Sequence, residues 1–320
     1  MEKQIGRIRL VRLPAVQLQL EGSARVKASR GRILTVTREY EAAMSVDHDY
    51  PNLARKSGSE VASREQRTSN TIATLAGRSL LSNSGIPLDL NWVREVRVNT
   101  SAVERRAQTQ VARRTVKKEW QAAWLLRAIS CMDLTTLSGD DTDERVRRLC
   151  AKARQPIQQD LVQKLGIEEL GVKVGAVCVY HTFIETALNA LEGSGVHVAA
   201  VSTGFPAGLS PLAERVAEIR RSVEAGAHEI DVVITRAHVF GGRWQALYDE
   251  VAAFKQACGA AHMKVILGTG DLLTLRNVAR ASFVAMMAGA DFIKTSTGKE
   301  PTNATLRNVS RSPVPRMTFM

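Results

Sequence analysis

A lysine lies within an apolar segment near the end of the chain, "DFIKTSTGK", which spans residues 291–299. Lys294 follows Phe292 and Ile293, so its side chain would be costly to bury as a charge. Either an acidic partner compensates the charge, or a lowered pKa leaves a neutral amine. A neutral amine can attack a carbonyl carbon and form a Schiff base. Lys294 is therefore a candidate nucleophile, and an edge charge or a phosphate contact is the alternative.

A carboxylate lies within a second apolar segment, "HEIDVVI", at residues 228–234. Asp231 is surrounded there by isoleucine and valine, and a buried aspartate requires a cation or hydrogen-bond donors nearby. Two interpretations follow. Asp231 belongs to a structural ion pair, or it moves protons beside the amine of Lys294.

The residues after Lys294 offer groups that bind anions. Ser296 and Thr297 supply hydroxyls, Gly298 an accessible backbone N–H, and Lys299 a positive charge. The segment lacks the G-x-x-x-x-G-K frame of a nucleotide-binding P-loop. We therefore expect a small anionic substrate to bind there.

Six strand-like segments alternate with helical patterns over the second half of the chain. They span residues 128–134, 174–180, 196–202, 228–234, 263–269 and 290–296. Several of the intervening helical patterns end in glycine, as helix C-caps do. This alternation predicts a parallel sheet with helical crossovers.

Two α/β architectures are compatible with this pattern, an open doubly wound sheet and a closed barrel. Asp133, Asp231 and Lys294 each lie within a predicted strand or at its carboxyl end. In a (β/α) barrel these ends converge on one mouth, where active sites form. The barrel is therefore the favoured architecture.

The first third of the chain has a different character. Residues 1–84 mix arginine, serine and glycine without a period of 2 or 3.6, which predicts a poorly ordered extension. Its glutamates argue against a mitochondrial transit peptide. Residues 101–129 show helical spacing with a basic, solvated face. A basic RNA-associated protein using residues 1–118 is an alternative, but aromatic residues placed to stack on bases are missing from the basic cluster.

Composition limits the remaining classes. The 320 residues carry a formal net charge of +12, and the four cysteines are too widely spaced for a metal site or a disulfide framework. No apolar run approaches the roughly 18 residues of a membrane span. We expect a cytoplasmic protein without a metal ion.

Five segments together resemble a known family. They are "DLTTLSGDDT" (133–142), "AVCVY" (176–180), "GFPAG" (204–208), "EIDVVI" (229–234) and "DFIKTSTGK" (291–299). This set resembles the motifs of the deoxyribose-phosphate aldolases, in family order, and residues 110–126 are similar to the animal form. The resemblance implies a class I aldolase on a TIM barrel. Such an enzyme reversibly cleaves 2-deoxyribose 5-phosphate to acetaldehyde and glyceraldehyde 3-phosphate without a metal or an organic cofactor.

The resemblance also implies roles for individual residues. Lys294 would form the Schiff base, and Asp231 would relay protons. Thr297 and Lys299 would lie near the substrate or its phosphate, while Asp133 and Cys178 would line the mouth of the barrel. The implied partner is a small phosphorylated sugar. Nucleic acid and membranes are not expected as partners, and a homo-oligomer is compatible with the sequence.

The chain departs from the family after residues 303–305. The family continues to a seventh strand with a second lysine in "KPAGG" and to an eighth strand with a glycine-rich phosphate loop, and neither motif occurs here. We therefore expect an incomplete TIM (β/α)8-type barrel of about six βα units, preceded by helices. Strands one and six would be unpaired edges. Without the second lysine, Lys294 should be less nucleophilic.

The resemblance and the change in composition along the chain predict three regions. A basic extension covers residues 1–84, a partial aldolase barrel covers 85–305, and a tail unlike the family covers 306–320. The expected function is the aldolase reaction. The alternative is a catalytically impaired, truncated isoform that acts through protein partners.

Overall fold

A computed structural model describes residues 82–112, 117–305 and 317–318. Its centre is a parallel sheet in which neighbouring strands follow the chain order. The strands are β1 (Asp133–Thr135), β2 (Ala176–Tyr180), β3 (His197–Ser202), β4 (Glu229–Val233), β5 (His262–Ile266), β6 (Phe292–Lys294) and β7 (Met317–Thr318). The predicted α/β class with a parallel, barrel-like sheet is confirmed.

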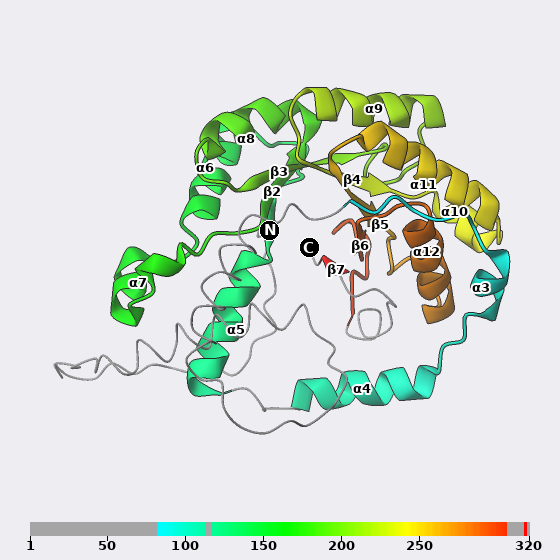
Figure 1. Cartoon of the computed structure of the whole chain (residues 1–320), viewed down its shortest axis with the longest axis horizontal. Coiled ribbons are helices and arrows are strands. Elements are labelled where there is room, and N and C mark those ends of the chain that lie inside the picture. Colours follow the sequence, from blue (N-terminus) through cyan, green and yellow to red (C-terminus); the bar gives the residue numbers. More distant parts are fainter. Residues whose placement is uncertain (1–81, 113–116, 306–316, 319–320) are drawn as a thin grey trace, which may run out of the picture.

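Helices form an arc around the outside of this sheet (Figure 1). The helices of the arc are α6 (Asp143–Arg154), α8 (Ile184–Leu191), α9 (Leu212–Glu224), α10 (Arg236–Phe240), α11 (Trp244–Cys258) and α12 (Leu275–Met287). The remaining described helices are α3 (Leu90–Glu95), α4 (Thr100–Ala112), α5 (Lys118–Ser130) and α7 (Gln159–Leu165). The strands and their covering helices make a partial (β/α) barrel.

Local sequence signals define several helix ends. The hydroxyl of Thr142 accepts a hydrogen bond from the backbone N–H of Arg145 and caps α6. Thr274 caps α12 in the same way through the N–H of Asn277. Helix α7 is capped at its C-terminus by Gly166, whose φ of 61° lies in the left-handed region that glycine adopts without strain.

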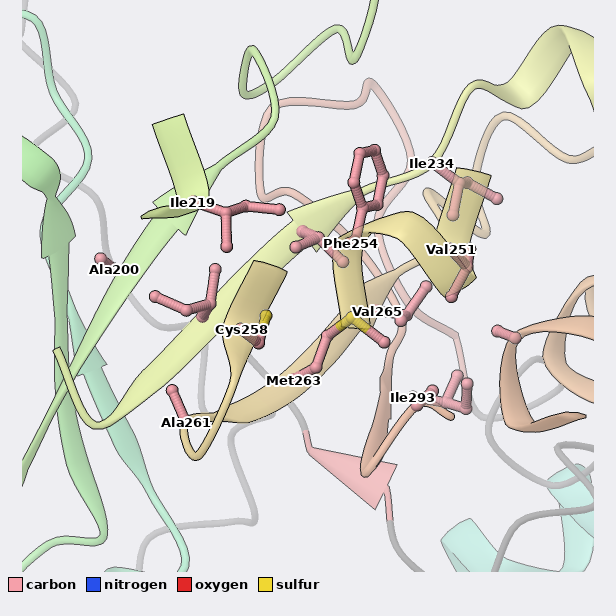
Figure 2. Close-up of a cluster of buried hydrophobic side chains, with 14 of the residues drawn as sticks. Ala200, Ile219, Ile234, Val251, Phe254, Cys258, Ala261, Met263, Val265 and Ile293 are labelled. Atoms are coloured by element: carbon pink, nitrogen blue, oxygen red, sulfur yellow. The ribbon is translucent and has the colours of Figure 1, made fainter. Parts of the chain in front are cut away.

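The hydrophobic core lies between the sheet and the outer helices. In Figure 2, Val251 and Phe254 of α11 face Met263 and Val265 of β5, and Ile219 of α9 lies beside them. Successive side chains of a strand point to opposite faces. Because these apolar residues point outward to the helices, the residues between them point into the interior of the partial barrel.

The predicted first strand is wrong at its start. Residues 128–134 were expected to form one strand, but α5 continues to Ser130 and β1 begins at Asp133. Ile129, near the end of α5, packs against the main hydrophobic core. The apolar residues before β1 therefore belong to a helix face, which a short apolar run does not distinguish from a strand.

The prediction that residues 101–129 are helical is confirmed. The structure describes two helices there, α4 and α5. Helix α4 ends at Ala112 and α5 begins at Lys118, and residues 113–116 lie outside the described residues. None of the helices in the described ranges is both long enough and apolar enough to cross a membrane.

The prediction that strand six is an unpaired edge is wrong. Strand β7 pairs in parallel with β6, with Met317 beside Ile293 and Thr318 beside Lys294 (Figure 1, red arrow). This pairing joins backbones over two residues, so it requires no side-chain pattern that the sequence would reveal. At the other end of the described sheet, β1 pairs with β2 alone, as predicted.

The first described residues form hydrogen bonds with the end of α12 and with the turn before β6. The N–H of Asn83 donates to Asp291 Oδ1 at 2.6 Å, and its side-chain amide donates to the carbonyls of Met286 and Ala290. The expected extension (1–84) and tail (306–320) otherwise fall mostly outside the described residues, so the domain organisation stays a prediction.

Candidate active site

The inner face of the sheet carries charged side chains, whereas its outer face is apolar. In the strand register, Asp231 of β4 lies beside Lys264 of β5, and Ile266 of β5 lies beside Lys294 of β6. Glu229 precedes Asp231 by two positions and therefore shares its face. The register alone thus collects acids and lysines from neighbouring strands in one interior.

Lys294 is completely buried and paired with an acid. Its Nζ contacts Asp231 Oδ2 directly and lies 4.0 Å from Asp133 Oδ2. Burial lowers the pKa of Lys294, but Asp231, Cys178 and Asp133 together outweigh it, so the pKa is raised above its ordinary value. Of the two possibilities open from the sequence, the structure shows the acid partner.

Lys264 is a second buried lysine, and it was not among the residues predicted from the sequence. Its Nζ contacts Asp133 Oδ2 and Glu229 Oε2 and lies 3.9 Å from Asp231 Oδ1. Burial lowers the pKa of Lys264, but the three carboxylates raise it well above its ordinary value. A lysine in the apolar strand "HMKVI" is the same signal that identified Lys294, so Lys264 could have been predicted from the sequence.

The carboxylates that hold Lys264 have pKa values shifted in opposite directions. Burial raises the pKa of Asp133 above its ordinary value, although Lys264 and Lys294 oppose the shift. Burial also disfavours the charge of Glu229, but the hydrogen bond from His197 and the charge of Lys264 lower its pKa to about 2. His197 adds a further hydrogen bond to Glu229, whereas the negative charge of Asp231 raises the pKa of Asp133 further. Glu229 was also not predicted as a site residue from the sequence.

Cys178 lies in the same interior and completes this part of the site. Its Sγ donates to Asp231 Oδ2 at 3.4 Å. Burial raises the pKa of this thiol far above its ordinary value, so it stays protonated. The structure therefore brings together four of the residues expected from the sequence: Asp133, Cys178, Asp231 and Lys294.

The loop after β6 places Thr297 and Lys299 differently. Thr297 is buried, and its backbone N–H donates to both carboxylate oxygens of Glu300, at 3.0 and 3.1 Å. The side chain of Lys299 is exposed, and its N–H donates to Thr297 Oγ1 at 3.1 Å. Within the described residues, Lys299 thus lies outside the buried ion cluster. Glu300 was not predicted, since nothing in its sequence spacing marks it as a partner of Thr297.

The described residues contain no group of three histidine, cysteine, aspartate or glutamate side chains arranged to hold a metal ion. The prediction that the reaction requires no metal or cofactor stays a prediction. What the site does contain is an amine in contact with a carboxylate that can accept its proton. That arrangement suits imine formation followed by proton transfer.

The sequence and the fold of this chain are similar to those of known aldolases. A family profile described as "DeoC/LacD family aldolase" matches residues 127–312. The deoxyribose-phosphate aldolase of Homo sapiens is 56% identical over 225 residues, covering 70% of this chain and 71% of that protein. The Mus musculus enzyme is 58% identical over 223 residues, covering 69% and 70%. A solved structure assigned as a deoxyribose-phosphate aldolase from Coccidioides immitis superposes with a TM-score of 0.50 at 25% identity, covering 66% of this chain and 78% of that one.

Proposed function

The chain belongs to the DeoC/LacD family of aldolases, and on that premise we propose that it cleaves 2-deoxyribose 5-phosphate with Lys294 as its Schiff-base lysine. The family makes the chain a carbon–carbon lyase. The animal relatives are deoxyribose-phosphate aldolases, so the proposed substrate is 2-deoxyribose 5-phosphate. The products would be acetaldehyde and glyceraldehyde 3-phosphate. The direct contact of Lys294 Nζ with Asp231 is the observation that carries the assignment of the nucleophile.

The first step requires a neutral amine. Lys294 releases a proton to Asp231, and the free electron pair of Nζ attacks the substrate aldehyde carbon C1. The carbinolamine loses its hydroxyl as water, and the proton held by the carboxyl group can assist this departure. The product is a protonated imine between Nζ and C1.

The imine then accepts the electrons of the bond that breaks. A base removes the proton of the C3 hydroxyl, and C3 becomes the aldehyde carbonyl as the C2–C3 bond breaks. The electron pair of that bond forms the C1=C2 double bond, and the π pair of the iminium moves to nitrogen. Glyceraldehyde 3-phosphate leaves, and an enamine remains on Lys294. Protonation of C2 and hydrolysis of the resulting imine release acetaldehyde and restore the amine. Asp231 is the proposed proton relay for these transfers, because its carboxylate contacts Nζ.

The other site residues have supporting roles in the proposal. Lys264 supplies a second positive charge near Lys294 and thereby opposes protonation of the amine. Thr297 and Lys299 are proposed to contact the substrate phosphate, supported by the exposed cation at Lys299. Asp133 and Cys178 would border the reacting carbons.

Three broader expectations belong to the same proposal. A cytoplasmic location is supported by four cysteines that are all free thiols. The partner is a small phosphorylated sugar rather than a nucleic acid, and a homo-oligomer remains compatible with the chain. The division into an extension (1–84), a partial barrel (85–305) and a tail (306–320) is proposed unchanged.

Borohydride reduction tests the nucleophile. The protein is incubated with acetaldehyde, reduced, digested and analysed by mass spectrometry. We expect an ethyl group on Lys294 and no adduct in Lys294→Arg, in which the guanidinium cannot form the imine. Lys264 is the internal control because it is equally buried but held by two carboxylates. Labelling at Lys264 with Lys294 unmodified would refute the assignment, as would the absence of any adduct.

A further inference from the structure

The buried ion pairs extend from Lys294 toward the opposite end of the sheet. Lys264 connects Asp231, at 3.9 Å, with Glu229, whose Oε1 lies 3.2 Å from His197 Nδ1. Lys294 is the last residue of β6, whereas Glu229 and His197 are the first residues of β4 and β3. In a parallel sheet, one chain of contacts thus runs from the carboxyl ends of the strands to their amino ends.

When every group of the buried cluster is ionised, its charges do not balance without His197. The buried cluster contains three carboxylates and two lysines: Asp133, Glu229, Asp231, Lys264 and Lys294. If all five groups are ionised, one negative charge remains in excess in a buried environment, where an unpaired charge is costly. His197 can offset that charge from its position beside Glu229, and its side chain is 46% exposed, so it exchanges protons with solvent.

Several other groups influence His197. Those that face it or its partner Glu229 are His228, Lys173, Lys264 and His262. The ring of His228 stacks on His197 with centroids 5.1 Å apart and planes 9° apart. The hydrogen bond to Glu229 raises the pKa of His197 above its ordinary value despite burial and the charges of the two lysines. For His228, burial and the neighbouring His197 lower the pKa, the opposite direction to the shift of His197.

We propose that His197 is a positioning residue that controls, through Glu229 and Lys264, how tightly the Lys294 amine holds its proton. Protonated His197 offsets one carboxylate charge, and Lys294 then releases its proton more readily. Neutral His197 leaves the excess negative charge, which retains the proton on the lysine. The proposal rests on the proposed function in treating Lys294 as the nucleophile.

The first test is the pH dependence of kcat/KM for three variants. The ratio of wild type to His197→Gln should be close to one at alkaline pH, where His197 is neutral. It should rise to between about threefold and tenfold as the pH falls through the pKa of His197, as expected for a unit charge at an effective dielectric constant of about 20. His197→Lys, which keeps the positive charge, should restore wild-type activity in the acidic range. His228→Gln should give a ratio that does not change with pH.

A structural role for His197 would lower activity by the same factor at every pH. A pH-independent ratio for His197→Gln would therefore overturn the proposal. Failure of His197→Lys to restore activity in the acidic range also counts against it.

The second test needs no activity. The pKa of the His197 imidazole is measured by NMR titration in the full chain. Coupling between sites is reciprocal, so Lys294→Met, which removes a buried cation, should raise the pKa of His197. Asp231→Asn keeps the shape and removes a negative charge, so it should lower that pKa. An unchanged pKa in both variants overturns the proposal. Because this readout does not depend on imine formation, a failed borohydride experiment and a failed coupling experiment are distinguishable.

Discussion

Lys294 and Asp231 contact each other although they belong to strands that are not neighbours. Strand β5 separates β4 from β6, and the two side chains meet across it in the interior of the sheet. Both groups are completely buried, and this one contact makes each the principal counter-charge of the other. The amine and its proton acceptor are therefore positioned before any substrate arrives.

Asp231→Asn should separate imine formation from cleavage. The variant removes the carboxylate that raises the pKa of Lys294, so burial should leave the amine easier to deprotonate and the acetaldehyde adduct should still form. Proton transfer should suffer, lowering kcat for cleavage by about 10²- to 10⁴-fold. Borohydride trapping and steady-state kinetics on the same sample measure both effects. Wild-type cleavage in this variant would exclude Asp231 as the proton relay.

Lys264→Met should destabilise the fold strongly. It leaves Asp133 and Glu229 buried without their shared cation, which costs about 3–5 kcal/mol for a broken buried pair. Lys164→Met is the matched control, since Lys164 pairs with Asp160 on the surface, where both side chains are more than half exposed. That change should cost about 1 kcal/mol or less. Urea denaturation measures the free energy of unfolding of both variants. Equal midpoints would contradict the prediction that the Lys264 contacts stabilise the fold more than the surface pair does.

Glu229 should make the free energy of unfolding depend on pH in the acidic range. Its pKa falls from an ordinary 4.5 to about 2 in the folded protein. A depressed carboxylate pKa contributes stability that is fully present above about pH 4.5 and is lost as the pH falls toward 2. The contribution is on the order of 3 kcal/mol. Glu229→Gln should lack this component.

The control for Glu229 is Asp140→Asn. Asp140 also has a pKa of about 2, through its hydrogen bonds from Ser138 and Arg145, but its side chain is exposed. Its replacement should change the acid dependence little, because solvent screens exposed pairs. Chemical denaturation at a series of pH values gives both results. Parallel curves for wild type and Glu229→Gln would show that Glu229 does not contribute as proposed.

Lys299→Gln should weaken binding of a phosphorylated substrate without affecting the fold. The side chain is exposed, so the free energy of unfolding should change by no more than about 0.5 kcal/mol. Loss of a charge-assisted contact to phosphate should raise KM by about three- to tenfold. Unphosphorylated 2-deoxyribose is the control substrate, and its kinetics should not change. Equal effects on both substrates would place the phosphate elsewhere.

The class of the fold and the two central residues of the site could be predicted from the sequence. Lys294 and Asp231 were recognisable because a charge within a run of valine and isoleucine requires a physical reason. The alternation of apolar strands with amphipathic helices fixed the parallel sheet for a similar reason, since only that arrangement covers both apolar faces. Local capping residues such as Thr142 and Thr274 then defined helix ends.

Which of these charged side chains contact each other depends on the tertiary structure. Whether Lys264 pairs with Asp133, Glu229 or Asp231 depends on strand register and on the curvature of the sheet, and neither is encoded in any single segment. The pairing of β7 with β6 is likewise invisible from the sequence, because backbone hydrogen bonds carry no side-chain signature. Isolated segments therefore identify charges that need partners, while long-range packing assigns those partners and with them the protonation of Lys294.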